Sequence, residues 1–429
     1  MDKKLENFCD FIEEGTSPFQ VVEAAEKRLK EAGFEELRFE TAWGITGGKK
    51  YYMVHHGTTL IAFTISKNIK HRDYFRIAAA HTDFPGLRVK PMPDVECKGY
   101  RQLNVEVYGG SILNTWLDRP LGIAGKVALR SETVFEPRVA YVQSKHPILT
   151  IPNLAIHMNK NINKGIELNR QRDMLPIVGV AGESETEKNF FIRYLSEELQ
   201  VEPEDILDFE LYAYIQERAQ SIGIHKEMIS SPRLDNLTSV SALLDGIIEG
   251  EREKGINVIA LFDHEEIGSR TKQGAGSMLL RDVVEKIQFS LGRDACQVKE
   301  MLYQSMLLSV DVAHALHPNQ ADKTDITNQP ILNKGICIKE AGNQSYATDC
   351  EAIAVVQQIC EKEEIPYQKY VNRSDIQGGS TLGSIASSIL PMKTVDIGIP
   401  ILAMHSAREL MGSEDMKSLS RFVTGYFSL

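Results

Sequence analysis

A short apolar run that ends in paired carboxylates constrains the fold of this chain more than any other stretch. Residues 255–261 read Gly-Ile-Asn-Val-Ile-Ala-Leu, which has the length and composition of a buried strand behind a glycine turn. Glu265 and Glu266 follow the carboxyl end of this strand. Open α/β sheets place their sites at this edge, and neighbouring strand side chains point to opposite faces. One carboxylate could therefore hold a metal while the other faces a bound water, although an isolated Glu-Glu pair more often belongs to a solvated loop.

Length, charge and cysteine spacing narrow the class of protein. The 429 residues are enough for one large or two ordinary domains. A net charge of -11 argues against a nucleic-acid partner. The six cysteines show no C-x-x-C spacing, which is typical of reduced thiols. The amino terminus lacks a signal-peptide core, and no apolar run reaches membrane-spanning length. We therefore expect a cytoplasmic protein without a membrane partner.

Helix and strand patterns alternate at both ends of the chain. Two amphipathic helices are predicted within residues 3–32, separated at 15–18, where Ser17 is a good N-cap and Pro18 fits a first turn. The further predicted elements are strands at 51–55, 60–66, 75–80, 255–261, 307–312 and 394–399, and helices at 237–253, 350–361 and 413–427. The simplest architecture is an α/β catalytic domain formed by residues 1–90 and 226–429.

The middle of the chain has a different pattern. Residues 91–225 carry short alternating segments, such as 102–107 and 123–129, that prolines and glycines punctuate. One helix is predicted near 184–200, where Ser184 and Glu187 have capping-box spacing. This region is therefore expected to form an inserted, β-rich second domain.

Five short motifs carry acidic or imidazole side chains. They are His81-Thr-Asp83, Asp235-Asn236, Asp263-His-Glu-Glu266, Asp311-Val-Ala-His314 and Met404-His405-Ser406. Two histidines and three or four carboxylates suit zinc, manganese or cobalt. Five such ligands are too many for one catalytic zinc with an open position, and they fit two metals that share a bridging carboxylate. Each motif alone is weak, because a His-Thr-Asp triplet commonly ends a strand and a single histidine is more often a core residue.

Taken together and in this order, the motifs resemble the aspartyl aminopeptidase family, a group of dinuclear zinc aminopeptidases. The resemblance covers nearly the whole chain and includes Gly378-Gly-Ser-Thr381 and the Lys339…Tyr346-Ala-Thr348 stretch. It implies a central mixed sheet flanked by helices, of the zinc peptidase type. It also implies a homo-oligomer, which in this family is a tetrahedral dodecamer, and the insertion at 91–225 is the natural interface candidate.

The resemblance implies a role for each metal ligand. His81 and Asp311 would hold one divalent ion, Glu266 and His405 would hold the other, and Asp235 would bridge the two. The ions would be zinc, with manganese or cobalt as alternatives. The peptide that follows the bridging aspartate is often cis in related dinuclear peptidases.

Two further residues would support the chemistry. Asp83 would hydrogen-bond the imidazole of His81 and orient it, although its simpler interpretation is a turn cap. Glu265 would act as the general base, taking a proton from the water that the two metals bind and passing it to the leaving amine.

The resemblance also assigns substrate-binding residues. Lys339 would receive an acidic side chain, and Tyr346 would help to position the substrate. His314 would stabilise the oxyanion, and Gly379 lies among amide donors at a helix start that suit carbonyl or carboxylate oxygens. His157, in the insertion, would reach a neighbouring subunit's site. The simpler interpretations are a solvated lysine for Lys339, a turn histidine for His314 and a structural histidine for His157.

Four interpretations of the function remain open at this point. The first is a metalloaminopeptidase that removes N-terminal Asp or Glu from peptides. The second has the same mechanism with a neutral or aliphatic preference, since Lys339 alone argues for acidic residues. The third is a related dinuclear zinc deacylase or carboxypeptidase, which would need a cation for a C-terminal carboxylate. The fourth is an inactive scaffold, against which Glu265 and the complete ligand set argue.

Overall fold

The computed structural model describes residues 3–70, 73–165, 167–181, 189–376 and 378–429. Backbone contacts divide the chain into two units. The first comprises Met1–Asp83, Ala219–Met404 and Glu409–Leu429, and the second comprises Phe84–Arg218 and His405–Arg408. The sequence predicts boundaries at residues 90 and 226, where the composition changes. The division lies earlier because the strand that begins at Gly86 already pairs within the second unit's sheet.

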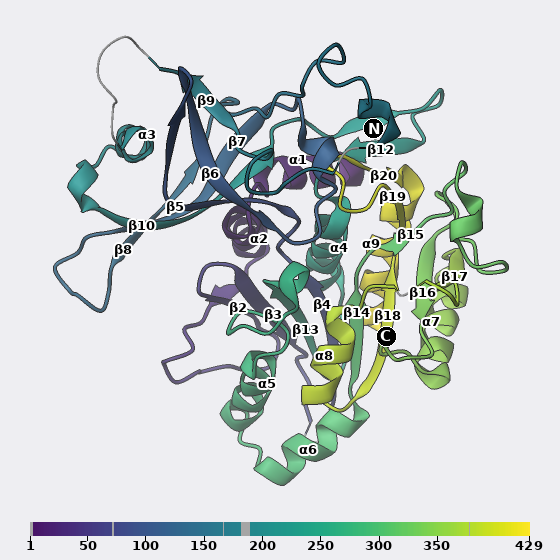
Figure 1. The fold of residues 1–429 in the computed structure, drawn as a ribbon. Helices are drawn as coiled ribbons and strands as arrows, with labels where there is room; N and C mark the ends of the chain where they lie inside the picture. The colour runs from purple at the N-terminus through teal and green to yellow at the C-terminus, as the bar shows by residue number, and fades with distance from the viewer. Residues whose placement is uncertain (1–2, 71–72, 166, 182–188, 377) are drawn as a thin grey trace. The chain divides into compact units, whose positions relative to one another are not determined.

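A nine-stranded sheet forms the centre of the first unit (Figure 1). Its strands, in spatial order, are β1 (Glu35–Glu36), β2 (Lys50–His55), β3 (Thr59–Ile65), β13 (Ile256–Phe262), β4 (Phe75–His81), β14 (Met306–Val310), β18 (Lys393–Gly398), β16 (Ile336–Glu340) and β17 (Tyr367–Val371). The four strands from β13 to β18 are parallel, whereas β3 and β16 run antiparallel to their central neighbours. The sheet is therefore mixed, as predicted.

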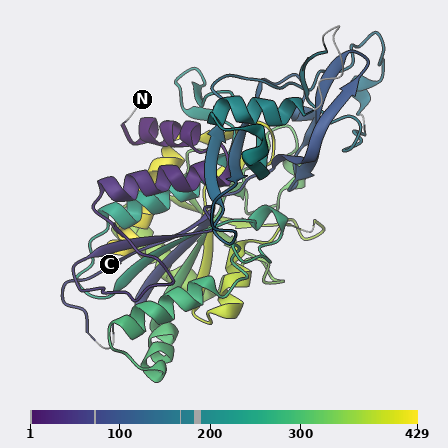
Figure 2. The same ribbon diagram turned by 90° about the vertical axis from the view of Figure 1, so that its left-hand side faces the viewer.

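Helices cover both faces of this sheet (Figure 2). The helices are α1 (Lys3–Glu14), α2 (Pro18–Glu31), α4 (Leu234–Glu249), α5 (Leu279–Ser290), α6 (Ala295–Gln304), α7 (Cys350–Lys362), α8 (Leu382–Ile389) and α9 (Ser413–Ser428). On one face α4 packs against β3, β4 and β13 and against α9, and on the other α8 packs against β4, β14 and β18. Every residue of β13 is buried, because a parallel sheet needs cover on both sides. The prediction of flanking helices is confirmed.

The break between the first two helices follows from capping chemistry. Ser17 adopts an extended conformation and accepts a hydrogen bond from the backbone N–H of Phe19 at 3.2 Å. Pro18 occupies the first turn of α2, where its missing N–H is not needed. The predicted start of this helix is confirmed.

The second unit contains a six-stranded antiparallel sheet. Its strands, in spatial order, are β8 (Arg138–Gln143), β7 (Leu121–Leu129), β10 (Ile206–Ile215), β5 (Gly86–Cys97), β6 (Tyr100–Tyr108) and β9 (Ile177–Val180). Helix α3 (Phe190–Leu199) buries Phe191 and Leu195 in the core of this unit. Ser184 and Glu187, the expected capping box, lie outside the described residues.

A small third sheet belongs to the first unit. It consists of β11 (Gln220–Ile222), β12 (Met228–Ser231), β20 (Glu409–Gly412), β19 (Pro400–Leu402) and β15 (Ala313–His314). None of the helices in the described part of the chain combines the length and the apolar character that a membrane crossing requires.

The topology brings the acidic motifs to one edge of the large sheet. His81 is the last residue of β4 and lies directly beside Phe262, the last residue of β13. Asp311 follows the end of β14, which is the other neighbour of β4. Because these three strands are parallel, the residues that follow them meet at their common carboxyl edge.

Candidate metal centre

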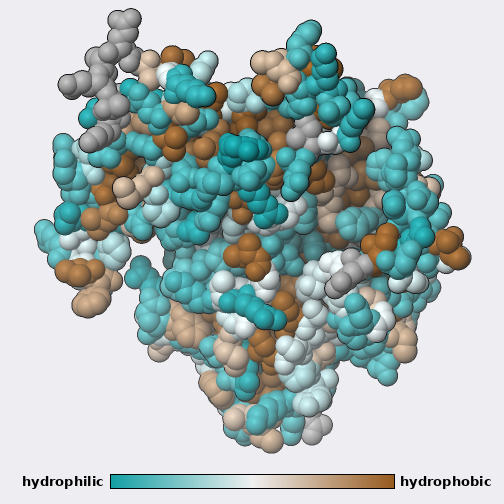
Figure 3. Space-filling model, in the orientation of Figure 1, coloured by the Kyte–Doolittle hydropathy of each residue, from teal (hydrophilic) through white to brown (hydrophobic). Residues whose placement is uncertain are grey.

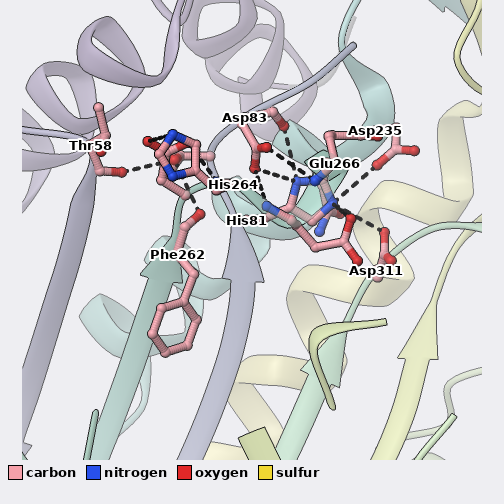
Figure 4. Close-up of polar contacts among 12 residues, drawn as sticks. Thr58, His81, Asp83, Asp235, Phe262, His264, Glu266 and Asp311 are labelled. Atoms are coloured by element: carbon pink, nitrogen blue, oxygen red, sulfur yellow. Dashed lines mark hydrogen bonds and ion pairs between the residues drawn. The ribbon is translucent and has the colours of Figure 1, made fainter. Parts of the chain in front are cut away.

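One histidine and three carboxylates converge at this edge (Figure 4). One ligand atom each from His81, Asp235 and Glu266 lie within 4.8 Å of one another. The Nε2 atom of His81 is 3.4 Å from Asp235 Oδ1 and 3.6 Å from Asp311 Oδ1. These side chains come from the end of β4, the start of α4, the turn after β13 and the end of β14, so a single edge gathers residues that are far apart in sequence.

The imidazole of His81 is held in one orientation. Its Nδ1 atom lies 3.0 Å from the backbone carbonyl oxygen of Asp83, so we assign the proton to Nδ1 as the donor. This tautomer leaves Nε2 as a lone-pair donor that faces Asp235 and Asp311. The ring is fully buried in the first unit.

The carboxylate of Asp83 has a different main contact from the one expected. Its Oδ1 and Oδ2 atoms accept hydrogen bonds from the backbone N–H groups of Glu265 and Glu266, each at 3.1 Å. Oδ1 also lies 3.4 Å from His81 Nδ1. The carboxylate therefore fixes the turn that carries both glutamates, and the imidazole contacts mainly the Asp83 carbonyl. The reason is the side-by-side pairing of β4 with β13, which brings the residues after both strands together.

The Glu265–Glu266 turn is a short 3-10 helix between two left-handed residues. His264 precedes it with φ 64°, and Gly268 ends it with φ 101°, a conformation that glycine adopts without a steric penalty. Glu266 is one of the three residues whose ligand atoms lie within 4.8 Å of one another, and Glu265 Oε2 lies 4.0 Å from His81 Nε2. The separate roles of the two glutamates stay a prediction.

The site concentrates negative charge in a buried setting. Burial raises the pKa of Glu265 to about 8; His81 opposes this shift, and Asp311 adds to it. Burial also raises the pKa of Glu266, and the nearby charge of Asp235 adds to the effect. Carboxylates packed this closely repel one another, and a divalent cation would relieve the repulsion. With one imidazole among them, the residues present fit zinc.

Hydrogen bonds from neighbouring elements hold the start of α4. The backbone N–H of Asp235 donates to Glu409 Oε2 at 3.0 Å, and Asn236 Nδ2 donates to the carbonyl oxygen of Val310 at 3.0 Å. The peptide between Asp235 and Asn236 is cis. Asp235 is therefore fixed both to β20 and to the end of β14, next to Asp311.

His405 lies in the second unit together with the three residues that follow it. Its Nδ1 atom is 3.3 Å from the carbonyl oxygen of Gly110, and its own carbonyl accepts from the N–H of Ile112 at 3.0 Å. The group of described side chains around His81 does not contain it. Its assignment as a metal ligand stays a prediction.

Lys339 is buried beside Asp311. Its side chain is only 2% exposed, and its Nζ atom donates to the carbonyl oxygen of Val312 at 3.1 Å. The same atom is 3.9 Å from Asp311 Oδ2 and 5.0 Å from the ring centre of Tyr346. Burial lowers the pKa of this ammonium, but Asp311 and other neighbours outweigh burial, and the pKa of Lys339 is raised overall. The interpretation of Lys339 as a solvated lysine is therefore wrong.

Three of the other expected substrate residues, His314, Gly379 and His157, are exposed. His314 and Gly379 line a cavity of about 370 Å³ in the first unit, together with Tyr370 and Arg373. His157 is exposed on a turn of the second unit. The structure therefore groups His314 with Gly379 and groups Lys339 with Tyr346.

Two buried residues were missed by the sequence analysis. Glu409 holds Asp235, as described above, and Asp396 lies fully buried in β18. The signal for Asp396 was visible, because it is the one charged residue in the apolar run Thr394–Ile399. No comparable signal points to Glu409, which lies between the charged Arg408 and the apolar Leu410.

Comparisons with known proteins agree with this geometry. The family described as Aminopeptidase I zinc metalloprotease (M18) matches residues 11–427. "Probable M18 family aminopeptidase 2" of Clostridium novyi is 46% identical over 414 residues, covering 96% of each chain. Ape4, in a cryo-EM structure of its complex with Nbr1, matches with a TM-score of 0.95 at 34% identity, covering 99% of this chain and 85% of that chain. The S. cerevisiae mApe1 dodecamer matches with a TM-score of 0.87 at 27% identity, covering 99% of this chain and 96% of that chain.

Proposed function

Because the chain belongs to the aminopeptidase I zinc metalloprotease (M18) family, and is therefore a zinc aminopeptidase, we propose that it removes acidic residues from the N-termini of peptides. Membership of an aminopeptidase family argues against the deacylase, carboxypeptidase and scaffold interpretations. The observation that carries the acidic preference is the buried ammonium of Lys339 beside the metal centre.

Two divalent ions would be bound per subunit. His81 and Asp311 would hold one, Glu266 and His405 the other, and Asp235 would lie between them; the convergence of four of these side chains supports this assignment. When bound, the ions would polarise the scissile carbonyl and make the attacking water more acidic. We infer zinc from the family and keep manganese and cobalt as alternatives.

Glu265 would move the proton. It lies next to Glu266 and outside the group of three ligand residues, with its Oε2 atom 4.0 Å from His81 Nε2, and a carboxylate at this position can accept a proton. Its carboxylate would take a proton from the attacking water and return it to the leaving amine. Asp83 would keep Glu265 aimed through the backbone hydrogen bond. His314 would donate to the oxygen of the tetrahedral intermediate.

Lys339 and Tyr346 would form the floor of the pocket for the N-terminal side chain. An ammonium has three donors, and the carbonyl of Val312 takes one of them. A substrate carboxylate that reaches this ammonium would form a charge-assisted hydrogen bond in a site shielded from water. Such bonds contribute about 1.5–3 kcal/mol, equivalent to about 10- to 150-fold in preference. A leucyl side chain would leave the ammonium facing an apolar group, and this unfavourable contact would lower the affinity for leucyl substrates further.

The test is the ratio of kcat/KM for aspartyl and glutamyl substrates to that for leucyl substrates. In Lys339→Met, which keeps the length of the side chain and removes its charge, the ratio should fall about 10- to 150-fold, mainly through loss of the acidic substrates. The matched control is Lys369→Met, because Lys369 lies on the neighbouring strand and pairs with Glu340 at 2.8 Å. Its ratio should not change.

A second candidate has the same mechanism with a neutral or aliphatic preference. The observation that favours it is the pairing of Lys339 with Val312 and Asp311, which already engages the ammonium within the protein. A wild-type protein that prefers leucyl substrates, or a Lys339→Met variant with an unchanged ratio, would select this candidate.

We also propose that the chain assembles as a homo-oligomer, as a dodecamer, in the cytoplasm. The structural similarity to a dodecameric aminopeptidase supports the assembly. The exposed position of His157 on the second unit suits contact with a neighbouring subunit. All six cysteines are free thiols, which suits a reducing compartment.

A further inference from the structure

Asp396 is a buried carboxylate that the chemistry above does not use. It lies directly opposite Lys339 in the antiparallel pair β16–β18 and beside Ser309 in the parallel pair β14–β18. Side chains at paired positions of adjacent strands project to the same face of a sheet. Ser309 precedes Asp311 by two residues, so this row lies about 7 Å from the metal ligand along the strand. Asp396 therefore lies in the row of side chains next to the one that contains Asp311, further from the carboxyl edge of the sheet.

The carboxylate of Asp396 joins two segments that carry expected substrate residues. Its Oδ2 atom accepts a hydrogen bond from the N–H of Ala347 at 2.6 Å, immediately after Tyr346. Its Oδ1 atom accepts from the hydroxyl of Thr381, the residue before α8. Its own backbone N–H donates to Thr348 Oγ1 at 3.0 Å. One side chain thus holds the loop that contains Tyr346 and the segment that follows Gly379.

Helix α8 closes over this arrangement. A methyl group placed on Gly383 would lie 2.6 Å from Ser309 Cβ and 2.9 Å from Asp396 Oδ1, so the helix approaches the row as closely as a glycine allows. Asp396 itself is fully buried. The carboxylate accepts from two donors, the amide of Ala347 and the hydroxyl of Thr381.

We propose that Asp396 is a positioning residue for substrate binding, whose carboxylate fixes the Tyr346 loop and the start of α8 on the face where Lys339 lies. This inference rests on the proposed function in one respect, namely that Tyr346 and Gly379 contact the substrate. Loss of the carboxylate should loosen both segments and leave the metal ligands in place, because the metal centre is anchored separately through Asp83 and Glu409.

The test uses the full chain with bound metal and the variant Asp396→Asn. The amide keeps the size of the side chain but has one acceptor oxygen for two donors. KM for the best wild-type substrate should rise about 10- to 100-fold, with a much smaller change in kcat. The metal content should equal that of the wild type.

Two threonines provide matched variants. Thr381→Val removes the hydroxyl that Asp396 accepts from and should raise KM in the same direction, whereas Thr381→Ser keeps the hydroxyl and should behave like the wild type. Thr394→Val is the control for stability, because Thr394 is a buried residue of the same strand and face whose hydroxyl donates to the carbonyl oxygen of Met392. It should lower the melting temperature without changing KM.

The outcomes separate this inference from the proposed function. Lost metal in Asp396→Asn, a fall in kcat at unchanged KM, or an equal rise in KM for Thr394→Val would overturn the positioning role. If Asp396→Asn does not fold, the KM values of Thr381→Val and Thr381→Ser are compared instead. Equal KM values for these two variants would overturn the positioning role. A wild type that prefers leucyl substrates overturns the acidic preference alone, because the KM comparison can be made with whichever substrate is best.

Discussion

The sheets of the two units differ in how much of each strand is buried. In β13 of the first unit all seven residues are buried, whereas β8 at the edge of the second unit's sheet buries only Val142. The first sheet is mostly parallel at its centre and has helices on both faces, so its polar side chains gather at the strand ends. The second sheet is antiparallel and can leave one face in contact with solvent or a partner. The first sheet thus presents polar side chains at its strand ends, whereas the second sheet presents an exposed face.

Exposed apolar side chains are concentrated in the smaller second unit. They include Met92, Val134, Phe135, Met158 and Val180. Val134 and Phe135 are 88% and 96% exposed and lie in the loop between β7 and β8, where Figure 3 shows hydrophobic side chains at the surface. Large exposed apolar groups commonly mark surfaces that a partner covers. We therefore expect the first unit to carry most of the residues of the reaction, and the second unit to carry the surface for assembly.

Removal of the metal should have the largest effect on activity, and it should separate the reaction from assembly. Chelation should abolish hydrolysis, because the buried carboxylates around His81 need a cation to act together. Zinc, manganese or cobalt should restore activity, and saturated protein should hold close to two ions per chain by elemental analysis. The particle size in light scattering should persist without metal. Full activity of metal-free protein would contradict the proposal.

Loss of the general base should have the next largest effect. Glu265→Gln should reduce kcat by roughly 100- to 10,000-fold, because the amide cannot take a proton from water. Its metal content should stay near that of the wild type. The matched variant is Glu266→Gln, which should lose metal from one site. Near-normal turnover of Glu265→Gln, or loss of its metal, would show that the two glutamates have been assigned wrongly.

Changes at the exposed surface of the second unit should have the smallest effect on turnover and the largest effect on the size of the assembly. Phe135→Asp should shift the light-scattering mass toward smaller species, because association would bury the charge of the new carboxylate. The control is Ile326→Asp in the first unit, where Ile326 is 87% exposed. His157→Ala should lower activity several-fold without loss of metal. A wild-type protein that is fully active as a monomer would contradict the role of the second unit in assembly.

The sequence predicts the parts of the site that depend on strand ends. The run before Glu265 has the composition of a buried strand, and the structure places Glu266 at its carboxyl edge beside His81. Ser17 and Pro18 likewise predict a helix start from local chemistry alone. The strand before Glu265 and the start of the helix depend only on the neighbours of each residue along the chain, and that information is present in the sequence.

Other features depend on partners that are distant in sequence. Asp83 binds the amides of Glu265 and Glu266, and Asp396 binds Ala347 and Thr381. No local pattern indicates such partners. Lys339 is also buried, although a lysine near a strand end is most often solvated. Long-range hydrogen bonds of this kind become visible only when the strand order is known.

The membership of His405–Arg408 in the second unit has a consequence for biosynthesis. Arg408 Nη1 donates to Glu217 Oε2 at 3.1 Å and to the carbonyl of Arg218, yet residues 219–404 separate these partners along the chain. A ribosome adds roughly 5–20 residues per second, so the wait between them is roughly 10 to 40 s. The nascent second unit must spend this interval with Glu217 lacking its partner Arg408. The second unit can therefore complete this contact only after residues 405–408 have been synthesised, long after the rest of its own residues.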